Sequence, residues 1–254
     1  MKPLSVARDL QRRRARERTG LFTAEGVRCV EELLASPLRL RSVALSPSLR
    51  ETDRGATLDG AVRAAAIAHR FYLSEATDAE LATAADTDSP QGIIAIGEQP
   101  ERSFDRINTT GIILVLDGIQ DPGNVGTILR AAQAFGVAAT VALPGTVDLW
   151  NPKVVRSAMG ALFSHQAFHA TASETVEFLR AHAIPIWATG AKGEPIGRRS
   201  GDTALAIVVG NEGSGVSSEL TRLAARTVAI PIRGVESLNV AVATGILLYA
   251  LTTA

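Results

Sequence analysis

The sequence predicts an α/β protein with two domains: a small N-terminal domain and a larger C-terminal domain built on a parallel sheet. Three observations lead to this prediction. The length of 254 residues suits one large or two modest domains. A polar stretch at 98–111 separates two regions in which β-like and helical segments alternate. The strands beyond it are almost continuously apolar, which is typical of a parallel sheet buried on both faces.

The N-terminal region alternates short β-like runs with alanine- and leucine-bearing helical stretches. The β-like runs are L-F-T-A-E, L-R-S-V-A-L-S, H-R-F-Y-L-S and Q-G-I-I-A-I-G, and the helical stretches include 26–35 and 75–84. The sequence E-Q-P-E-R-S-F-D-R-I-N-T-T-G that follows has no sustained apolar period, which suits a linker. We therefore expect a domain at 1–97, a linker at 98–111 and a second domain at 112–254.

The C-terminal region opens with the strand-like run I-I-L-V-L, a glycine-rich loop and an alanine-rich helical stretch that ends at F-G. Further apolar runs follow as V-A-A-T-V-A-L, I-P-I-W-A-T, A-L-A-I-V-V-G and V-A-I-P-I. We expect helices near 153–159 and at roughly 238–252. Strands that alternate with helices in this way favour a parallel sheet.

Charge is balanced overall but unevenly distributed. The 26 basic and 26 acidic residues give a formal net charge of zero, so average charge gives no indication of nucleic acid. Residues 1–28, however, carry eight basic side chains against three acidic ones: Lys2, Arg8, Arg12, Arg13, Arg14, Arg16, Arg18 and Arg28 against Asp9, Glu17 and Glu25. This basic arm suits contact with phosphate; a solvated helix face or a frayed terminus is the alternative.

The single cysteine limits the possible chemistry. Cys29 lies in the apolar run V-R-C-V-E-E-L-L, and one cysteine builds neither a disulfide framework nor a cysteine metal cluster. We expect it in the core, with a nucleophile as the alternative. No run of about 18 apolar residues occurs, and no apolar stretch follows the arginine-rich start as a signal peptide requires. A cytoplasmic protein without membrane or metal is the expectation.

Three loops should lie at the carboxyl ends of predicted strands, where open α/β sheets place their ligands. They span 117–130, 210–217 and 230–239, and they are rich in glycine, asparagine and hydroxyl groups rather than histidine or cysteine. Backbone amides and small polar side chains should therefore recognise the ligand. Gly123 and Gly126 are three apart, so the first loop forms no dinucleotide fingerprint, and the chain contains no P-loop.

Five polar residues in these loops are candidates for chemistry. Asn124 and Arg130 can project towards one pocket if a helix begins near Asn124; a helix cap and a surface cation are the alternatives. Glu212, the only acid of the second loop, could orient a catalytic cation or cap the next helix. Ser237 and Asn239 stand at the start of the C-terminal helix, where capping is again the alternative.

Together, these segments resemble the three ordered motifs of the SpoU family in the SPOUT methyltransferase superfamily. The first motif, N-V-G-x-x-x-R, falls on Asn124, Gly126 and Arg130, and the second, G-x-E-x-x-G-x-S, falls on Gly210, Glu212, Gly215 and Ser217. The third falls on Ile230, Pro231, Ser237, Leu238 and Asn239. One such motif would be weak evidence of the resemblance, whereas three motifs in the same order are specific to the family. Ala241 departs from the serine that relatives often carry, which leaves the proposed site intact.

The resemblance extends firmly over 112–254. The segment R-A-R-E-R-T-G-L-F-T-A-E-G-V-R-C-V-E-E-L-L is similar to the opening of the L30e-like substrate-binding domain that precedes the catalytic domain in many relatives. What the resemblance implies for the fold is a deep trefoil knot in the catalytic domain. It implies S-adenosylmethionine as the cofactor, held by backbone around Thr189, Gly190, Gly210, Ile230 and Leu238.

The implied chemistry is attack of a ribose 2′-hydroxyl on the sulfonium methyl, which needs positioning and no metal. The implied catalytic set is Asn124, Arg130, Glu212, Ser237 and Asn239. Relatives are often described with the arginine as base, but a guanidinium stays protonated in proteins. We therefore expect Arg130 to clamp the adjacent phosphate. Asn124, Ser237 and Asn239 would hold the ribose and shape the cofactor pocket, while Glu212 orients Arg130 or Asn124.

The resemblance thus implies an S-adenosylmethionine-dependent RNA 2′-O-methyltransferase that acts on structured RNA. Its domain layout favours 23S-type ribosomal RNA over transfer RNA. It also implies a homodimer paired through the knot region, with RNA selected by the N-terminal domain and the basic arm. One alternative is a catalytically silent RNA-binding or ribosome-assembly factor with the same fold, which cofactor binding would test. The other alternative is a nucleotide-dependent oxidoreductase, but the sequence lacks the glycine fingerprint that such an enzyme needs to bind phosphate.

Overall fold

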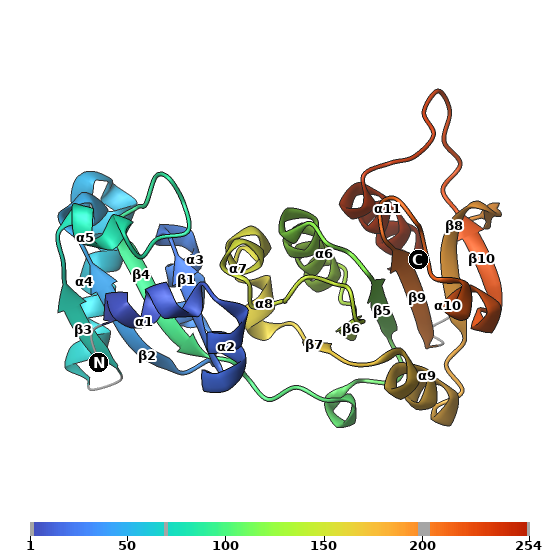
Figure 1. The fold of residues 1–254 in the computed structure, drawn as a ribbon, viewed down its shortest axis with the longest axis horizontal. Coiled ribbons are helices and arrows are strands. Elements are labelled where there is room, and N and C mark those ends of the chain that lie inside the picture. The colour runs from blue at the N-terminus through green and yellow to red at the C-terminus, as the bar shows by residue number, and fades with distance from the viewer. Residues whose placement is uncertain (1–2, 69–70, 198–203, 253–254) are drawn as a thin grey trace. The chain divides into compact units, whose positions relative to one another are not determined.

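The computed structural model describes residues 3–68, 71–197 and 204–252. The chain divides into two compact units (Figure 1). The first comprises 1–101 and 150–164, and the second comprises 102–149 and 165–254. A short segment from the later half of the chain therefore folds with the N-terminal residues.

The first unit is built on a four-stranded sheet of order β1-β4-β2-β3, in which only the β2–β3 pair is parallel. Its strands are β1 (Leu21–Glu25), β2 (Leu40–Leu45), β3 (Tyr72–Glu75) and β4 (Ile93–Glu98). Its helices are α1 (Pro3–Leu10), α2 (Arg13–Thr19), α3 (Val27–Ala35), η1 (Pro47–Glu51), α4 (Asp53–Ile67), α5 (Asp78–Ala82), α7 (Pro152–Ala158) and α8 (Ala161–Ser164).

The four β-like runs of the sequence correspond to these four strands, although His69 and Arg70 of the third run lie outside the described residues. The sequence analysis did not predict α4. Of the large apolar side chains of this helix, Leu58 and Val62 are buried whereas Ile67 is 78% exposed, so its apolar period is weak.

The N-terminal segment is helical and packed, and it leaves Arg12, Arg13, Arg14 and Arg18 exposed while Arg16 is buried. Helix α1 buries Ala7 and Leu10, which belong to two hydrophobic clusters of this unit. The Arg16 guanidinium is buried and donates to the Leu10 carbonyl oxygen at 2.6 Å and to the Gln11 carbonyl oxygen at 2.9 Å. Arg16 is therefore a structural cation rather than a phosphate contact. Lys2 lies outside the described residues.

Aromatic contacts explain why 150–164 folds with the first unit. The Phe22 ring of β1 lies 4.5 Å from the Trp150 ring and 5.6 Å from the Phe163 ring, measured between centroids. Cys29 is part of the same interior, as expected, and its thiol contacts the Val155 carbonyl oxygen at 3.9 Å. Burial raises the pKa of Cys29 to about 12, which disfavours the thiolate that a nucleophile needs.

The second unit is built on a six-stranded sheet of order β10-β8-β9-β5-β6-β7, and every pairing in it is parallel. The sequence prediction of a parallel sheet is confirmed. Its strands are β5 (Ile112–Asp117), β6 (Ala139–Ala142), β7 (Ala167–His169), β8 (Ile186–Pro195), β9 (Leu205–Gly210) and β10 (Arg226–Ala229). Its helices are η2 (Phe104–Arg106), α6 (Pro122–Ala134), α9 (Ala172–Ala181), α10 (Ser218–Leu223) and α11 (Val240–Thr252).

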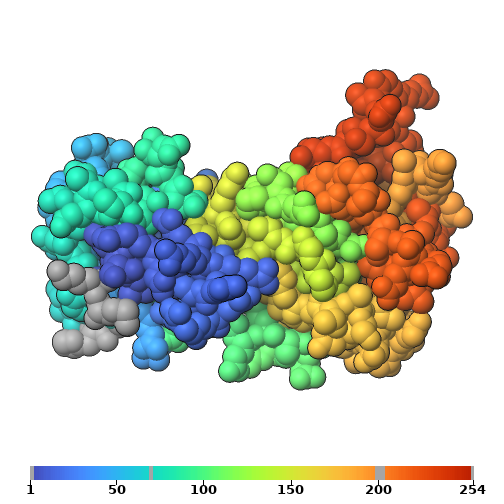
Figure 2. All heavy atoms as spheres, in the orientation of Figure 1, coloured from blue at the N-terminus to red at the C-terminus, as the bar shows by residue number. Residues whose placement is uncertain are grey.

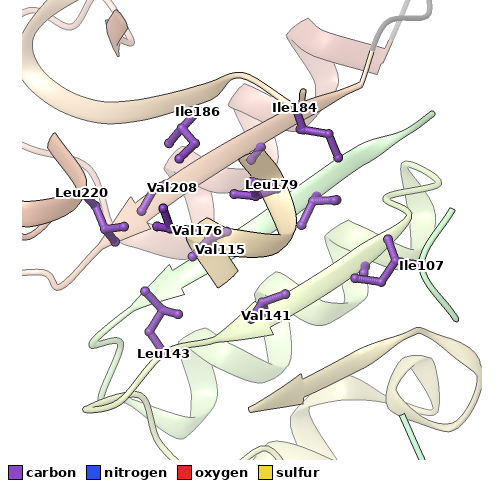
Figure 3. Close-up of a cluster of buried hydrophobic side chains, with 13 residues drawn as sticks. Ile107, Val115, Val141, Leu143, Val176, Leu179, Ile184, Ile186, Val208 and Leu220 are labelled. Atoms are coloured by element: carbon purple, nitrogen blue, oxygen red, sulfur yellow. The ribbon is translucent and has the colours of Figure 1, made fainter. Parts of the chain in front are cut away.

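Helices cover both faces of this sheet. On one face, Val115, Val141 and Val208 of the central strands pack with side chains of α9 and α10, among them Val176 and Leu220 (Figure 3). Alternate strand residues point to the other face, where α11 packs against α6 and β9. The ends of β5 and β9 are thereby fixed within a close-packed core.

Candidate active site

The site begins where two neighbouring strands end. Asp117 at the end of β5 pairs with Gly210 at the end of β9, so the loops that follow start side by side. Two hydrogen bonds tie these loops together. Asp117 Oδ2 accepts from the Ser217 amide at 2.7 Å, and the Asn211 side chain donates to the Gly118 carbonyl oxygen at 2.9 Å.

The first loop leads into α6, whose N-cap is Asp121. The Asp121 side chain accepts from the backbone N–H of Asn124 at 2.8 Å, and Pro122 occupies the first turn. Asn124 is therefore not the cap of this helix, and its side-chain amide is available to other groups. The capping alternative for Asn124 is ruled out.

One amide joins all three loops. The Asn124 Nδ2 group donates to Glu212 Oε1 at 2.8 Å, and Asn124 Oδ1 accepts from Asn239 Nδ2 at 3.0 Å. Asn239 also caps α11, because its Oδ1 accepts from the backbone N–H of Ala241 at 3.0 Å and of Val242 at 3.2 Å. Capping fixes the Asn239 side chain, which in turn orients Asn124. Glu212, in contrast, caps no helix.

The second loop folds back onto the end of β9. A Cβ atom at Gly210 would lie 2.1 Å from the Gly215 carbonyl carbon, and Gly215 itself adopts φ +70°. Asn211 Oδ1 holds the turn by accepting from the backbone N–H groups of Gly213 and Ser214 at 2.9 and 3.2 Å. Glycine is required at 210 because backbone crosses in the space that a side chain would fill.

A pocket of about 280 Å³ lies against these loops. Its walls include all five residues expected to hold the cofactor and two of the expected catalytic residues: Thr189, Gly190, Gly210, Ile230, Leu238, Glu212 and Ser237. Apolar side chains of α11 and β10, among them Leu247 and Val228, complete the walls, and Glu236, which the sequence analysis did not single out, joins them. The segment between β10 and α11 that forms one wall projects from the second unit (Figures 1 and 2).

Arg130 is the one expected catalytic residue that the structure does not bring to this cluster. It lies six residues after Asn124 on α6, which amounts to about 9 Å along the helix axis and about 120° around it. Its side chain is exposed and makes no hydrogen bond or ion pair with the described residues. No hydrogen bond joins Arg130 to Asn124, and Glu212 contacts Asn124 rather than Arg130.

Besides Glu236, three residues that shape the site were missed by the sequence analysis: Asp117, Asp121 and Asn211. The pair Asp121-Pro122 is a helix-start signal that could have identified the cap. Nothing local marks Asp117 or Asn211, since their roles depend on the pairing of β5 with β9.

Within 3–68, 71–197 and 204–252, no group of three or more His, Cys, Asp or Glu residues is arranged to hold a metal. No helix in those ranges is long and apolar enough to cross a bilayer.

Fold and site together define an α/β domain that holds a small molecule at the carboxyl ends of parallel strands, largely through backbone and amide groups. Comparison with protein families specifies the class. Residues 111–249 match the SpoU rRNA Methylase family, and residues 5–95 match the MRM3-like substrate binding domain. The chain belongs to the SpoU rRNA methylase family.

Individual relatives can be aligned with nearly the whole chain. The 23S rRNA (guanosine(2553)-2′-O)-methyltransferase RlmP of Bacillus subtilis is 34% identical over 244 residues, which is 95% of this chain and 92% of that protein. Among solved structures, the SpoU methyltransferase AviRb of Streptomyces viridochromogenes, in complex with AdoMet, has a TM-score of 0.86 at 25% identity, covering 98% of this chain and 96% of that one. An AdoMet-bound rRNA methyltransferase of Sinorhizobium meliloti has a TM-score of 0.83 at 27% identity, covering 98% and 94%.

Proposed function

We propose that this protein transfers a methyl group from S-adenosylmethionine to a ribose 2′-hydroxyl of ribosomal RNA. The observation that carries the proposal is the hydrogen-bonded chain Asn239–Asn124–Glu212, in which Glu212 also lines the pocket. Family membership and relatives named as 23S rRNA 2′-O-methyltransferases support it. Transfer RNA is the less favoured substrate.

The residues of the pocket fit S-adenosylmethionine. Ile230, Leu238 and Val228 supply apolar walls for a purine ring, and Gly190 and Gly210 contribute backbone to the lining of the pocket. A Cβ atom at Gly190 would come within 3.1 Å of Thr227 Cγ2, so this wall has little room for a larger residue. When bound, the cofactor supplies an electrophilic methyl group on its sulfonium.

The chain's own side chains have positioning roles in this reaction. Asn124 and Asn239 present amide groups that can bind the hydroxyls of a ribose, and Ser237, two residues before Asn239, lies on the pocket wall. Glu212 holds the Asn124 amide in one orientation, so that its carbonyl oxygen faces Asn239. Correct placement of the hydroxyl is the main requirement of such a displacement.

Arg130 is proposed as a clamp on the phosphate next to the target ribose. A guanidinium remains protonated, so it stabilises developing negative charge rather than accepting a proton. Its exposed position on α6, away from the pocket walls, suits contact with an RNA strand laid across the site.

The proposal is tested with Arg130→Lys and Arg130→Ala in single-turnover methyl transfer and in cofactor binding. Lysine keeps the charge but loses the planar fork, so Arg130→Lys should lose about 100-fold in rate with cofactor affinity almost unchanged. Near-complete recovery of Arg130→Lys at alkaline pH would contradict the clamp, and wild-type rate in Arg130→Ala would exclude Arg130 altogether. A chain that binds ribosomal RNA but neither binds nor consumes S-adenosylmethionine would instead be the silent assembly factor.

We further propose that residues 1–97 select the RNA, that 98–111 link the domains and that 112–254 carry methyl transfer. Helix α1 contributes to the core of the first unit, so deleting residues 1–18 would unfold part of it. The sharper test replaces the exposed Arg12, Arg13 and Arg14 by glutamine. RNA affinity should fall and its salt dependence should flatten, whereas cofactor binding stays constant. Unchanged affinity and salt dependence would leave these arginines as a solvated helix face.

A homodimer is proposed because α11 leaves an apolar stripe uncovered in the single chain. Val242, Ile246 and Tyr249 are 53%, 39% and 59% exposed, and their i, i+4, i+7 spacing places them on one side of the helix.

We also propose a cytoplasmic location. The single cysteine, Cys29, is free and buried, and free thiols persist in the reducing environment of the cytoplasm. Cell fractionation with recovery of the protein in the membrane pellet would contradict it.

The trefoil knot also remains a proposal, supported by family membership. A knot tightens when the ends of a chain are pulled, so the unfolded molecule should be shorter than its contour length. Single-molecule stretching should therefore end short of the roughly 3.3–3.6 Å per residue of a fully extended chain. Full extension would show that the chain is unknotted.

A further inference from the structure

The first unit contains a second polar pocket that methyl transfer does not use. It measures about 360 Å³, and its lining includes Glu25, Arg28, Thr87, Gln91, Arg156 and Met159. All of these residues belong to the first unit, although Arg156 and Met159 come from the segment 150–164. The pocket is as large as a typical small-molecule site and is lined by acceptors, donors and cations.

Glu25 is the unusual residue of this pocket. It is the last residue of β1, and only 7% of it is exposed. Its Oε2 accepts from the backbone N–H of Asp86 at 2.8 Å and lies 4.0 Å from an Arg156 nitrogen. Its Oε1 is buried and has no hydrogen-bond partner among the described residues. A buried acceptor without a donor is costly, so this oxygen indicates that a donor is supplied from outside the chain.

The surroundings restrict what that donor is. Burial raises the pKa of Glu25, while the Asp86 amide, the Arg156 charge and the Thr87 amide act in the opposite direction. Arg156 is engaged with Asp86 Oδ2 at 2.9 Å, so it does not turn to Oε1. A ligand that satisfies Oε1 would therefore bring an N–H or O–H group into the pocket.

Three other groups of the lining match a nucleotide. The Gln91 carbonyl oxygen accepts from the Val27 amide at 2.9 Å, which leaves the NH₂ group of Gln91 as a donor. The half-buried Met159 offers a polarisable thioether, which packs well on ring edges and faces. Arg28 is exposed beside them, where a guanidinium can bind phosphate.

We infer that this pocket binds an unstacked RNA base whose exocyclic amino group donates to Glu25 Oε1, with Arg28 on the adjoining phosphate. Adenine, cytosine and guanine present such an amino group, and uracil does not. Carboxylates accept from the cytosine amino group in base recognition, and sequence-specific RNA recognition mostly uses bases splayed out of the strand. The inference rests on the proposed function only in taking RNA as the substrate, and it makes Glu25 a specificity-determining residue outside the methyl-transfer site.

Matched homopolymers provide the test. Oligo(C) and oligo(U) differ on the ring at position 4, which is an amino group in cytosine and a carbonyl in uracil. Short single-stranded oligomers of each are titrated with the full-length protein by fluorescence anisotropy. The wild type should bind oligo(C) about tenfold more tightly, the effect expected for one hydrogen bond to a charged group. Oligo(A) should likewise bind more tightly than oligoinosine, because adenine carries an amino group at position 6 and hypoxanthine carries a carbonyl there. Equal affinities within both pairs would overturn the inference.

Glu25→Gln reverses the chemistry without changing the shape. The Asp86 amide requires an oxygen at the Oε2 position, so the new NH₂ group takes the place of Oε1 and becomes a donor. Preference should then shift from oligo(C) towards oligo(U). Glu51→Gln on η1 removes the same charge at an exposed position and should keep the wild-type preference. If the Glu25→Gln protein also kept the wild-type preference for oligo(C), the inference would be contradicted.

Two further measurements keep the outcomes separate. Thermal unfolding should show Glu25→Gln at least as stable as the wild type, because a neutral amide is easier to bury than a carboxylate. Methyl transfer to ribosomal RNA by the wild type tests the proposed function in the same preparation. Active wild type without any base preference would overturn only the pocket assignment, whereas base preference without methyl transfer would overturn only the proposed function.

Discussion

Removing the Asn124–Glu212 hydrogen bond should reveal whether the three loops act as one unit. The perturbation is a double-mutant cycle of Asn124→Ala, Glu212→Ala and the double variant. The Nδ2–Oε1 distance of 2.8 Å is that of a hydrogen bond to a carboxylate, which contributes about 1.5–3 kcal/mol. Both groups are partly solvated, so we take the lower end, about 1.5 kcal/mol, which corresponds to roughly tenfold in rate.

The assay is single-turnover methyl transfer to ribosomal RNA at saturating S-adenosylmethionine. Each single variant should lose at least tenfold, because Glu212→Ala frees the amide that Asn124→Ala removes. The double variant should be little worse than the poorer single one, which gives a coupling energy of about 1.5 kcal/mol. Glu219→Ala on α10, exposed and outside the hydrogen-bonded chain, is the matched control. Additive losses in the double variant would refute the coupling and leave Glu212 with an independent role.

Three further perturbations test the fold and assembly. Gly210→Ala should abolish cofactor binding, because its Cβ would lie 2.1 Å from backbone, whereas Gly60→Ala, which has open space on α4, should bind normally. Burial first, and the Arg102 charge second, lower the pKa of His165 to about 4. Stability should therefore be complete above about pH 6.5 and fall by about 3 kcal/mol towards pH 4, as the unfolded chain alone takes up the proton. In denaturant titrations, His165→Gln should reduce the loss of unfolding free energy between pH 6.5 and pH 4. The control His182→Gln, at an exposed position, should leave that loss unchanged. Val242→Asp should give a monomer by light scattering if the α11 stripe is the dimer surface; an unchanged mass would place the interface elsewhere.

Local sequence pattern predicted the parallel sheet of the second unit, although it did not identify β7, α9 or α10. Its central strands β5, β6 and β9 are buried along almost their whole length, so their residues are largely apolar, and that pattern predicts a parallel sheet between helices. The pattern was weaker for α4, where few side chains face the core. It was also misleading at the N-terminus, because a run of arginines does not reveal that Arg16 is buried against backbone carbonyls.

The sequence by itself determined the family, the parallel sheet and the residues that surround the pocket, since motifs and apolar periods are local properties of the chain. Only the tertiary structure decided which of those residues meet. Asn124 reaches Glu212 across 88 residues and Asn239 across 115, because β5 and β9 are neighbours in the sheet and α11 returns beside α6. Arg130 makes no hydrogen bond to this chain of residues, so its role stays a prediction. The unpartnered oxygen of Glu25 likewise arises only when β1 and the segment 150–164 pack together, because burial depends on what the rest of the chain places around a residue.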